Sequence, residues 1–166
     1  MRHSASQAHY ETESQTAVGG NAKETEMNMF TDQFGKYVCV GDSIECEVDG
    51  YTVMAHLEHD PYCDIDDDDH HNPDQSVTGC DDTEQEKLLA ARHAWERGEW
   101  FYGGIVLSVS RNGIMINRHA AALWGIECNY PDSDNSYLWD VANELLPEAL
   151  ERAGTERQNM LAKLAS

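Results

Sequence analysis

An alternating stretch around the Asn-Gly pair at positions 112–113 constrains the fold more than any other part of the sequence. Apolar and polar side chains alternate before this pair and resume their alternation after it. Asn-Gly tolerates positive φ at both central positions of a two-residue turn, so the pattern predicts a β-hairpin. Such a turn would place Val109 opposite Ile116, apolar against apolar. The fit is imperfect, because Leu107 would then face Arg118.

A second hairpin is predicted around the Asp-Gly pair at positions 49–50, which has the same turn chemistry. A two-residue turn there would join apolar residues across one face, namely Val48 with Tyr51, Cys46 with Val53 and Ile44 with Ala55. The opposite face would carry Glu45, Glu47 and Glu58. One side of this sheet is therefore expected to be buried, and the other to be acidic or covered by a partner.

Two helices are expected beside these hairpins. The first begins at Asp82 or Thr83 and ends at Gly98. Its apolar stripe consists of Leu88, Ala91 and Trp95. The second helix starts near Ser136, and Pro147 either kinks it or opens a further helix. Its expected buried residues share one helical face: Leu138, Val141, Ala142, Leu145 and Ala149.

The resulting order is ββαββα, which predicts an α+β fold: an antiparallel sheet of two hairpins with helices on one face. Residues 119–128 either extend the last strand or form a short helical turn, because periodicity does not decide between them. Residues 1–29 are expected to form a disordered polar tail, and residues 30–153 a single α+β domain with an acidic loop at 59–82. Residues 154–166 are expected to form a C-terminal helical tail.

Charge narrows the classes of function. The 166 residues include 31 Asp and Glu against 11 Lys and Arg, a formal net charge of −20. Such a field repels nucleic acids and anionic membranes and attracts basic protein surfaces, so direct binding of nucleic acid is not expected. The same composition would arise if acidity served only solubility or adaptation to salt. All three interpretations stay open at this point.

Cysteine usage and hydropathy favour a cytoplasmic protein. No apolar run approaches the ~18 residues of a membrane span, and no hydrophobic signal segment is expected before the domain. The five cysteines are odd in number and contain no CxxC pair, so no disulfide framework is indicated. A reducing compartment, the cytoplasm, agrees with both features.

Candidate zinc ligands lie in and around the acidic loop: His56, His59, Cys63, His70, His71 and Cys80. Their residue types suit zinc, but their spacing matches no zinc signature. The alternative is that His56 is an exposed strand residue and that the cysteines are small apolar fillers. A calcium loop is not supported, because Asp69 stands where Gly is required and Gln75 where Glu is required.

The sequence contains none of the common catalytic or phosphate-binding motifs, so a non-enzymatic protein is expected. The consecutive aromatics at positions 100–102 cannot all face inward on a strand. Aromatic rings surrounded by carboxylates suit an arginine-rich surface through stacking and ion pairing. Trp100 and Tyr102 are therefore candidate anchors for a basic partner.

The segment Trp95–Leu150 includes the runs WFYGGIVLSVSRNGI, HAAALWGIECNYP and NSYLWDVANELLPEAL. In these runs it resembles a family of small uncharacterised proteins that bacterial phages and other mobile elements carry. The resemblance implies a bacterial host and a mobile-element context. It implies no mechanism, and the family has no functional residues to carry over.

In that context, the leading hypothesis is an inhibitor that mimics DNA and occupies the basic groove of a host defence complex of the CRISPR or restriction type. One DNA strand advances ~3.4 Å per phosphate, and residues on one face of a strand recur at about twice the ~3.3 Å rise. Carboxylates on a sheet can therefore imitate alternate phosphates. The predicted contacts are Glu45, Glu47, Glu58, Asp66, Asp67, Asp68 and Asp69, with Trp100 and Tyr102 as anchors. No cofactor is required.

The alternative hypothesis is a zinc-binding regulatory or structural accessory protein built on the His/Cys/Asp loop. Elemental analysis of the purified protein separates it from the first, since stoichiometric zinc is expected only here. A third hypothesis is an accessory module of a phage particle or host complex with an apolar, salt-insensitive interface. A homodimer also stays open.

Overall fold

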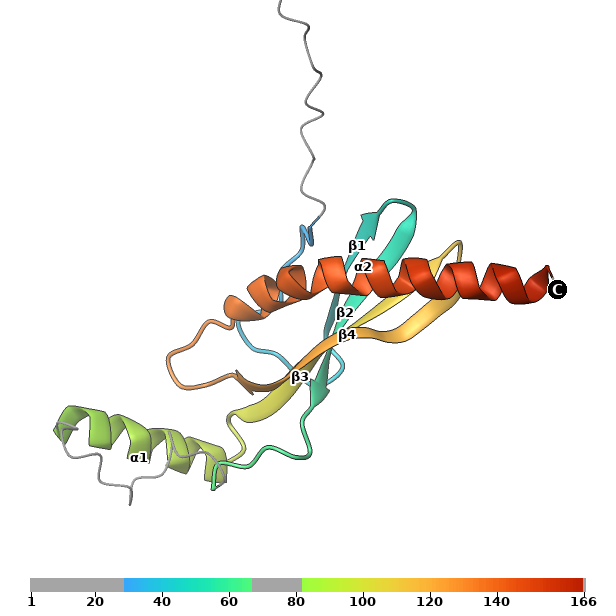
Figure 1. Cartoon of the computed structure of the whole chain (residues 1–166). Coiled ribbons are helices and arrows are strands. Elements are labelled where there is room, and N and C mark those ends of the chain that lie inside the picture. Colours follow the sequence, from blue (N-terminus) through green and yellow to red (C-terminus); the bar gives the residue numbers. More distant parts are fainter. Residues whose placement is uncertain (1–28, 67–81, 166) are drawn as a thin grey trace, which may run out of the picture.

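A computed structural model describes residues 29–66 and 82–165 of the chain. Its elements are β1 (Ser43–Val48), β2 (Tyr51–His59), α1 (Asp82–Glu96), β3 (Phe101–Arg111), β4 (Ile114–Cys128) and α2 (Tyr137–Leu164). The strands form one antiparallel sheet in the order β1-β2-β3-β4 (Figure 1). The predicted α+β class, with its two hairpins and ββαββα order, is confirmed.

Both predicted turns form with the expected backbone. Asp49 and Gly50 have φ values of 50° and 75°, and Asn112 and Gly113 have values of 51° and 76°. Positive φ at both central residues is the conformation that continues the right-handed twist of the flanking strands. The local sequence therefore determines where each hairpin turns.

The β1–β2 hairpin keeps the predicted register over its whole length. Val48 lies opposite Tyr51, Cys46 opposite Val53 and Ile44 opposite Ala55. Ile44, Val48, Val53 and Ala55 are buried in the main core, and Cys46 packs against it half-buried. The apolar face predicted from alternation is thus the face that the rest of the molecule covers.

The β3–β4 hairpin follows the predicted register only beside its turn. Arg111 lies opposite Ile114, as a two-residue turn requires, but Val109 lies opposite Asn117 and not opposite Ile116. The register shifts at three points along the pair, because the 15 residues of β4 pair with only 11 residues of β3. The predicted pairing of Val109 with Ile116 is therefore wrong, because β4 contains bulges that the turn does not reveal.

The largest bulge of β4 removes the unfavourable pairing of Leu107 with Arg118 that a hairpin without bulges would contain. Leu107 lies opposite Ala121, so it does not face Arg118. Residues 118–120 of β4 together span the position opposite Ser108. Burial explains the shift, because Leu107 is fully buried and a charged residue opposite it would lose its hydration. Residues 119–128 extend the strand, which settles the alternative left open by periodicity.

Helix α2 covers one face of the sheet and contacts β3 and β4 (Figure 1). Its buried residues lie on one helical face: Leu138, Ala142, Leu146, Ala149 and Ala153. Val141 and Leu145, predicted as buried, are half-buried at the flanks of this stripe. Pro147 lies inside the helix, so no second helix begins there. The helix runs on through Gly154 to Leu164, so the predicted tail is its last part and extends beyond the sheet.

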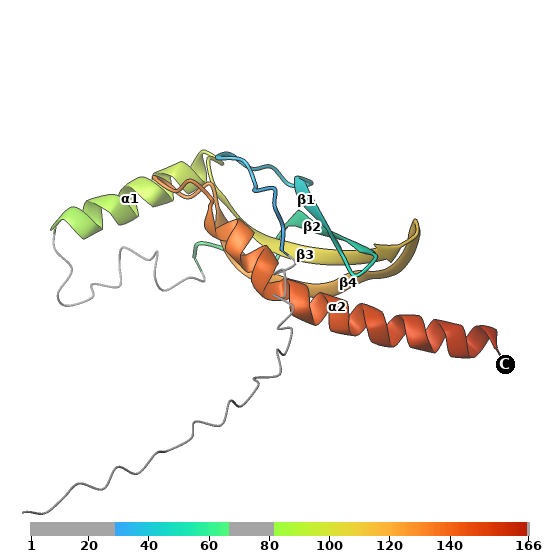
Figure 2. The same ribbon diagram turned by 90° about the horizontal axis from the view of Figure 1, so that it is seen from above.

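Helix α1 lies beyond one end of the sheet and not over the face that α2 covers (Figures 1 and 2). Its buried residues are Ala91 and Ala94, whereas Leu88 and Trp95 are half-buried. Its last turns pack on a second apolar cluster formed by Ile65, Ala94, Trp100 and Tyr102. Gly98, with a φ of 68°, ends this helical region as predicted.

A short segment before the sheet is held by asparagine side chains. Asn129 accepts a hydrogen bond from the Val38 amide and donates one to the Val38 carbonyl, at 2.9 and 2.8 Å. Asn135 donates to the Lys36 carbonyl at 2.8 Å. Phe30 is fully buried in the main core. The region that directly follows the predicted tail is therefore packed on the domain.

Candidate functional site

The face of the sheet opposite α2 carries three of the predicted acidic contacts. Glu45 and Glu47 are exposed and alternate with the buried residues of β1. Glu58 is half-buried at the end of β2. It shares the face of Glu45 and Glu47, because all three alternate with residues of the main core. The structure thus brings the predicted glutamates onto one surface.

A second acidic row lies on the outer side of α2, and the sequence analysis missed it. Asp140, Glu144, Glu148 and Glu151 are all exposed, opposite the buried stripe of the helix. Arg152 forms an ion pair with Glu148 at 2.8 Å, which partly neutralises one end of the row. The spacing of four residues, complementary to the apolar stripe, is a signal from which this row could have been predicted.

The acidic loop contributes only its first part to the described structure. The Asp66 carboxylate forms an ion pair and a hydrogen bond with the Arg92 guanidinium of α1. Because this carboxylate is engaged within the molecule, it is less available to a partner than the sequence predicts. Asp67, Asp68 and Asp69 lie outside the described residues.

The prediction that Trp100 and Tyr102 are partner-binding anchors is wrong for this conformation. Their exposed fractions are 1% and 2%. The Trp100 indole donates a hydrogen bond to the Ala91 carbonyl at 2.8 Å, and the two rings meet edge to face with centroids 5.2 Å apart. Burial is possible because Trp100 precedes the first residue of β3 and packs with Tyr102 under α1, while Phe101 faces the main core. The three aromatics therefore divide between two cores.

The described zinc candidates do not gather into one site. The His56 imidazole Nε2 lies 2.9 Å from the Ser108 hydroxyl, whereas the His59 ring stacks on Phe101. Within residues 29–66 and 82–165, no group of three His, Cys, Asp or Glu side chains is placed to hold a metal ion. His70, His71 and Cys80 lie outside these residues, so a zinc site that includes them stays a prediction.

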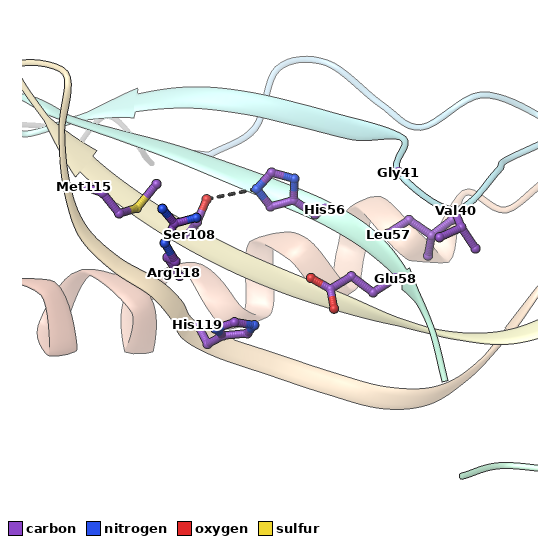
Figure 3. Close-up of a pocket in the computed structure, with 9 residues that line it drawn as sticks. All are labelled: Val40, Gly41, His56, Leu57, Glu58, Ser108, Met115, Arg118 and His119. Carbon is purple, nitrogen blue, oxygen red and sulfur yellow. Dashed lines mark hydrogen bonds between the residues drawn. The ribbon is translucent and has the colours of Figure 1, made fainter. Parts of the chain in front are cut away.

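The sheet face opposite α2 also contains a groove of about 370 Å³. His56, Glu58, Ser108, Met115, Arg118 and His119 contribute to its lining (Figure 3). Arg118 and His119 enter this groove from the bulge of β4. This groove is not predictable from the pattern of alternation, because its residues come together only through a register shift in β4.

Burial and neighbouring charge both act on a thiol beneath the sheet glutamates. Desolvation raises the pKa of Cys46 to about 11, and Glu47 and Glu45 contribute to the same shift. At the end of β4, burial raises the pKa of Cys128 to about 12. Both thiols therefore stay protonated at neutral pH, which makes them poor nucleophiles and poor metal ligands.

Comparisons with known proteins give no relatives: no family model, no curated protein and no solved structure matches the chain. Among the described residues, neither helix combines the length and the apolar character that crossing a bilayer requires. The surfaces of the molecule are therefore the basis on which a function can be argued.

Proposed function

We propose that this protein is a non-enzymatic, acidic inhibitor that occupies the DNA-binding surface of a basic host defence protein. The observation that supports it best is the row of exposed carboxylates on α2, formed by Asp140, Glu144, Glu148 and Glu151. The helix beneath this row is anchored on the sheet through its opposite side. The charges are therefore held in a fixed order, which a partner surface can recognise.

The spacing of these charges is close to that of a DNA backbone. Residues four apart on an α-helix are separated by ~6 Å along its axis, from the ~1.5 Å rise per residue. Alternate phosphates of one DNA strand are ~7 Å apart along the duplex axis. Asp140, Glu144 and Glu148 follow the first spacing, and Glu45 and Glu47 follow a similar one of ~6.6 Å on β1. Either row suits a surface built to bind phosphates.

The α2 row is the stronger of the two candidates. It holds four exposed carboxylates on one rigid element, whereas the sheet row has two exposed carboxylates and the half-buried Glu58. Its basic neighbour is Arg152, whose ion pair with Glu148 is exposed on both sides and so of low strength. We therefore assign the main contact to α2 and a supporting one to β1.

The bacterial, mobile-element context of the proposal rests on the resemblance predicted for the segment Trp95–Leu150. Such an inhibitor would act in the bacterial cytoplasm, where the defence proteins that bind nucleic acid are found. A net charge of −20 favours fast, salt-sensitive association with a basic surface. The partner is then defined by its chemistry: a protein whose basic groove otherwise holds duplex or guide-paired nucleic acid.

The test is capture from a bacterial lysate at low salt, followed by elution with duplex DNA. Proteins that DNA displaces are then purified, and their affinity for three triple variants is measured. The first variant is Asp140→Asn, Glu144→Gln and Glu148→Gln on α2. The second is Glu45→Gln, Glu47→Gln and Glu58→Gln on the sheet. The matched control, Glu86→Gln, Glu96→Gln and Asp132→Asn, removes the same charge from other exposed positions.

We expect the α2 variant to weaken binding by about 0.6–3 kcal/mol at low salt, because each of its three exposed charge pairs contributes ~0.2–1 kcal/mol. The sheet variant should weaken it less, and the control should leave it close to the parent. Equal loss in all three variants would show that net charge alone attracts the partner. That result, or a captured protein that duplex DNA does not displace, contradicts the proposal.

A further inference from the structure

The groove on the sheet face opposite α2 differs in charge from the rest of the molecule. The bulge of β4 places Arg118 and His119 opposite Ser108, where a regular strand would supply one residue. Figure 3 shows Arg118 beside Ser108 and Met115, with His56 on the neighbouring strand. One guanidinium and two imidazoles thus line a hollow in a chain of net charge −20.

Among the described arginines, Arg118 and Arg157 have neither an ion pair nor a side-chain hydrogen bond, and of these two Arg118 lines the groove. Arg92, Arg97 and Arg152 form ion pairs with Asp66, Glu99 and Glu148, respectively. Arg111 lies over the Tyr51 ring and donates to the Asp49 carbonyl. Within the described residues Arg118 makes no ion pair, although Glu58 lines the same groove. A guanidinium that carboxylates do not neutralise, in so acidic a protein, is available to an anion from outside.

The groups beside Arg118 complete a polar site. The Ser108 side chain is oriented by its 2.9 Å hydrogen bond with the His56 imidazole. A hydroxyl has one donor and two acceptor positions, so this bond leaves Ser108 able to contact a ligand. His119 faces the groove from β4, and Glu58 faces it from β2 (Figure 3). The site therefore combines a cation, a fixed hydroxyl and one carboxylate.

We propose that this groove binds the oxyanion group, phosphate or carboxylate, of a small molecule. Arg118 holds the oxyanion by a two-pronged contact that guanidinium groups make with such anions. Ser108 and His119 add hydrogen bonds, and Glu58 accepts a donor elsewhere on the ligand. The volume of about 370 Å³ lies within the range of small-molecule sites, ~300–1,000 Å³. This inference does not depend on the main contact proposed above, which lies on α2, although Glu58 belongs both to the groove and to the supporting contact on the sheet.

Titration of the isotope-labelled full chain with inorganic phosphate, and separately with acetate, tests the site by nuclear magnetic resonance. We expect saturable shifts at the amides of Ser108 and His119 with at least one of the two anions. Phosphate alone would identify a phosphorylated ligand, and acetate alone a carboxylate ligand. Saturation by both would support the shared oxyanion chemistry.

Three variants make the assignment specific. Arg118→Gln should weaken the binding at least tenfold, whereas Arg157→Gln, which removes an exposed charge from the C-terminal half of α2, should leave it unchanged. Glu58→Gln should strengthen the binding of the simple anion, since it removes a like charge from the groove. Folding of each variant is checked by its amide spectrum outside the groove.

Two results would overturn the proposal. The first is the absence of saturable shifts in the parent protein with either anion. The second is an equal loss in the Arg118 and Arg157 variants, which would reduce the effect to diffuse attraction by positive charge. Neither result affects the lysate-capture experiment with basic partners. The groove and the acidic row of α2 are therefore tested independently.

Discussion

The two hairpins begin from nearly identical turns and end with different surfaces. Asp49-Gly50 and Asn112-Gly113 have the same backbone conformation, within a few degrees of φ. The first hairpin continues without a register shift, whereas the second shifts repeatedly along its length. The turn therefore fixes only the pairs next to it, and the burial of side chains decides the register farther along.

The regular β1–β2 hairpin has a structural role, whereas the bulged β3–β4 hairpin also contributes residues to the candidate site. The regular β1–β2 pair alternates a buried apolar face with Glu45 and Glu47, as its sequence predicts. In the bulged β3–β4 pair, Arg118 and His119 both reach the groove beside Ser108. The candidate ligand site thus lies where the pattern of alternation is interrupted.

The largest loss of stability is expected when Leu107, whose position opposite Ala121 is set by the bulge, is truncated. Leu107→Ala should destabilise the protein by about 2–5 kcal/mol, because Leu107 is fully buried opposite Ala121. Ile114→Ala, at the exposed end of the same hairpin, should change stability by less than about 0.5 kcal/mol. Urea unfolding followed by circular dichroism measures both. A small loss in the Leu107 variant would indicate that the regular register, with Leu107 near Arg118, is populated.

Substitutions at the two turns are expected to lower the free energy of unfolding by smaller amounts, which are similar for the two turns. Gly113→Ala should cost roughly 1 kcal/mol, because its φ of 76° is unfavourable for alanine while a Cβ there meets no atom within 4 Å. Gly50→Ala should cost somewhat more, since its Cβ would lie 3.2 Å from the Arg111 guanidinium. The same unfolding experiment compares them. If the Gly113 variant were much less stable than the Gly50 variant, the turn would contribute to the bulged register, and burial alone would not decide it.

Sequence reasoning predicted those features of the fold that depend on local chemistry. Both turns, the register of β1–β2 and the end of the first helical region at Gly98 follow from residue types a few positions apart. The prediction that Trp100 and Tyr102 are exposed anchors was wrong, because their burial also depends on Ile65 and Tyr130, which come from distant parts of the chain.

The candidate sites also divide into those that local sequence patterns predict and one that they do not. Glu45 and Glu47 were predictable from alternation, and the α2 row could have been predicted from its four-residue spacing. The groove was not predictable, since Arg118 approaches Ser108 only after β4 has gained residues relative to β3.

The smallest expected effect is a change in the alkylation rate of Cys46 in the first hairpin. Cys128 in the second hairpin serves as the internal control. Burial raises the pKa of Cys46 to about 11 and that of Cys128 to about 12, but Glu45 and Glu47 add to the shift only at Cys46. A thiol reacts as its thiolate, so lowering its pKa increases its rate of alkylation at a fixed pH below that pKa. In the variant Glu45→Gln, Glu47→Gln, we therefore expect Cys46 to react a few-fold faster at pH 8.5 while Cys128 is unchanged.

Timed alkylation with iodoacetamide, quantified for each cysteine peptide by mass spectrometry, measures both rates in one sample. The expected increase is limited because desolvation, the largest cause of the Cys46 shift, is unaffected by the substitutions. Faster reaction of both cysteines would indicate local unfolding and not a change in charge. No change at Cys46 would mean that water screens the two glutamates from the thiol, and the β1 row would then exert too weak a field to support the contact proposed for it.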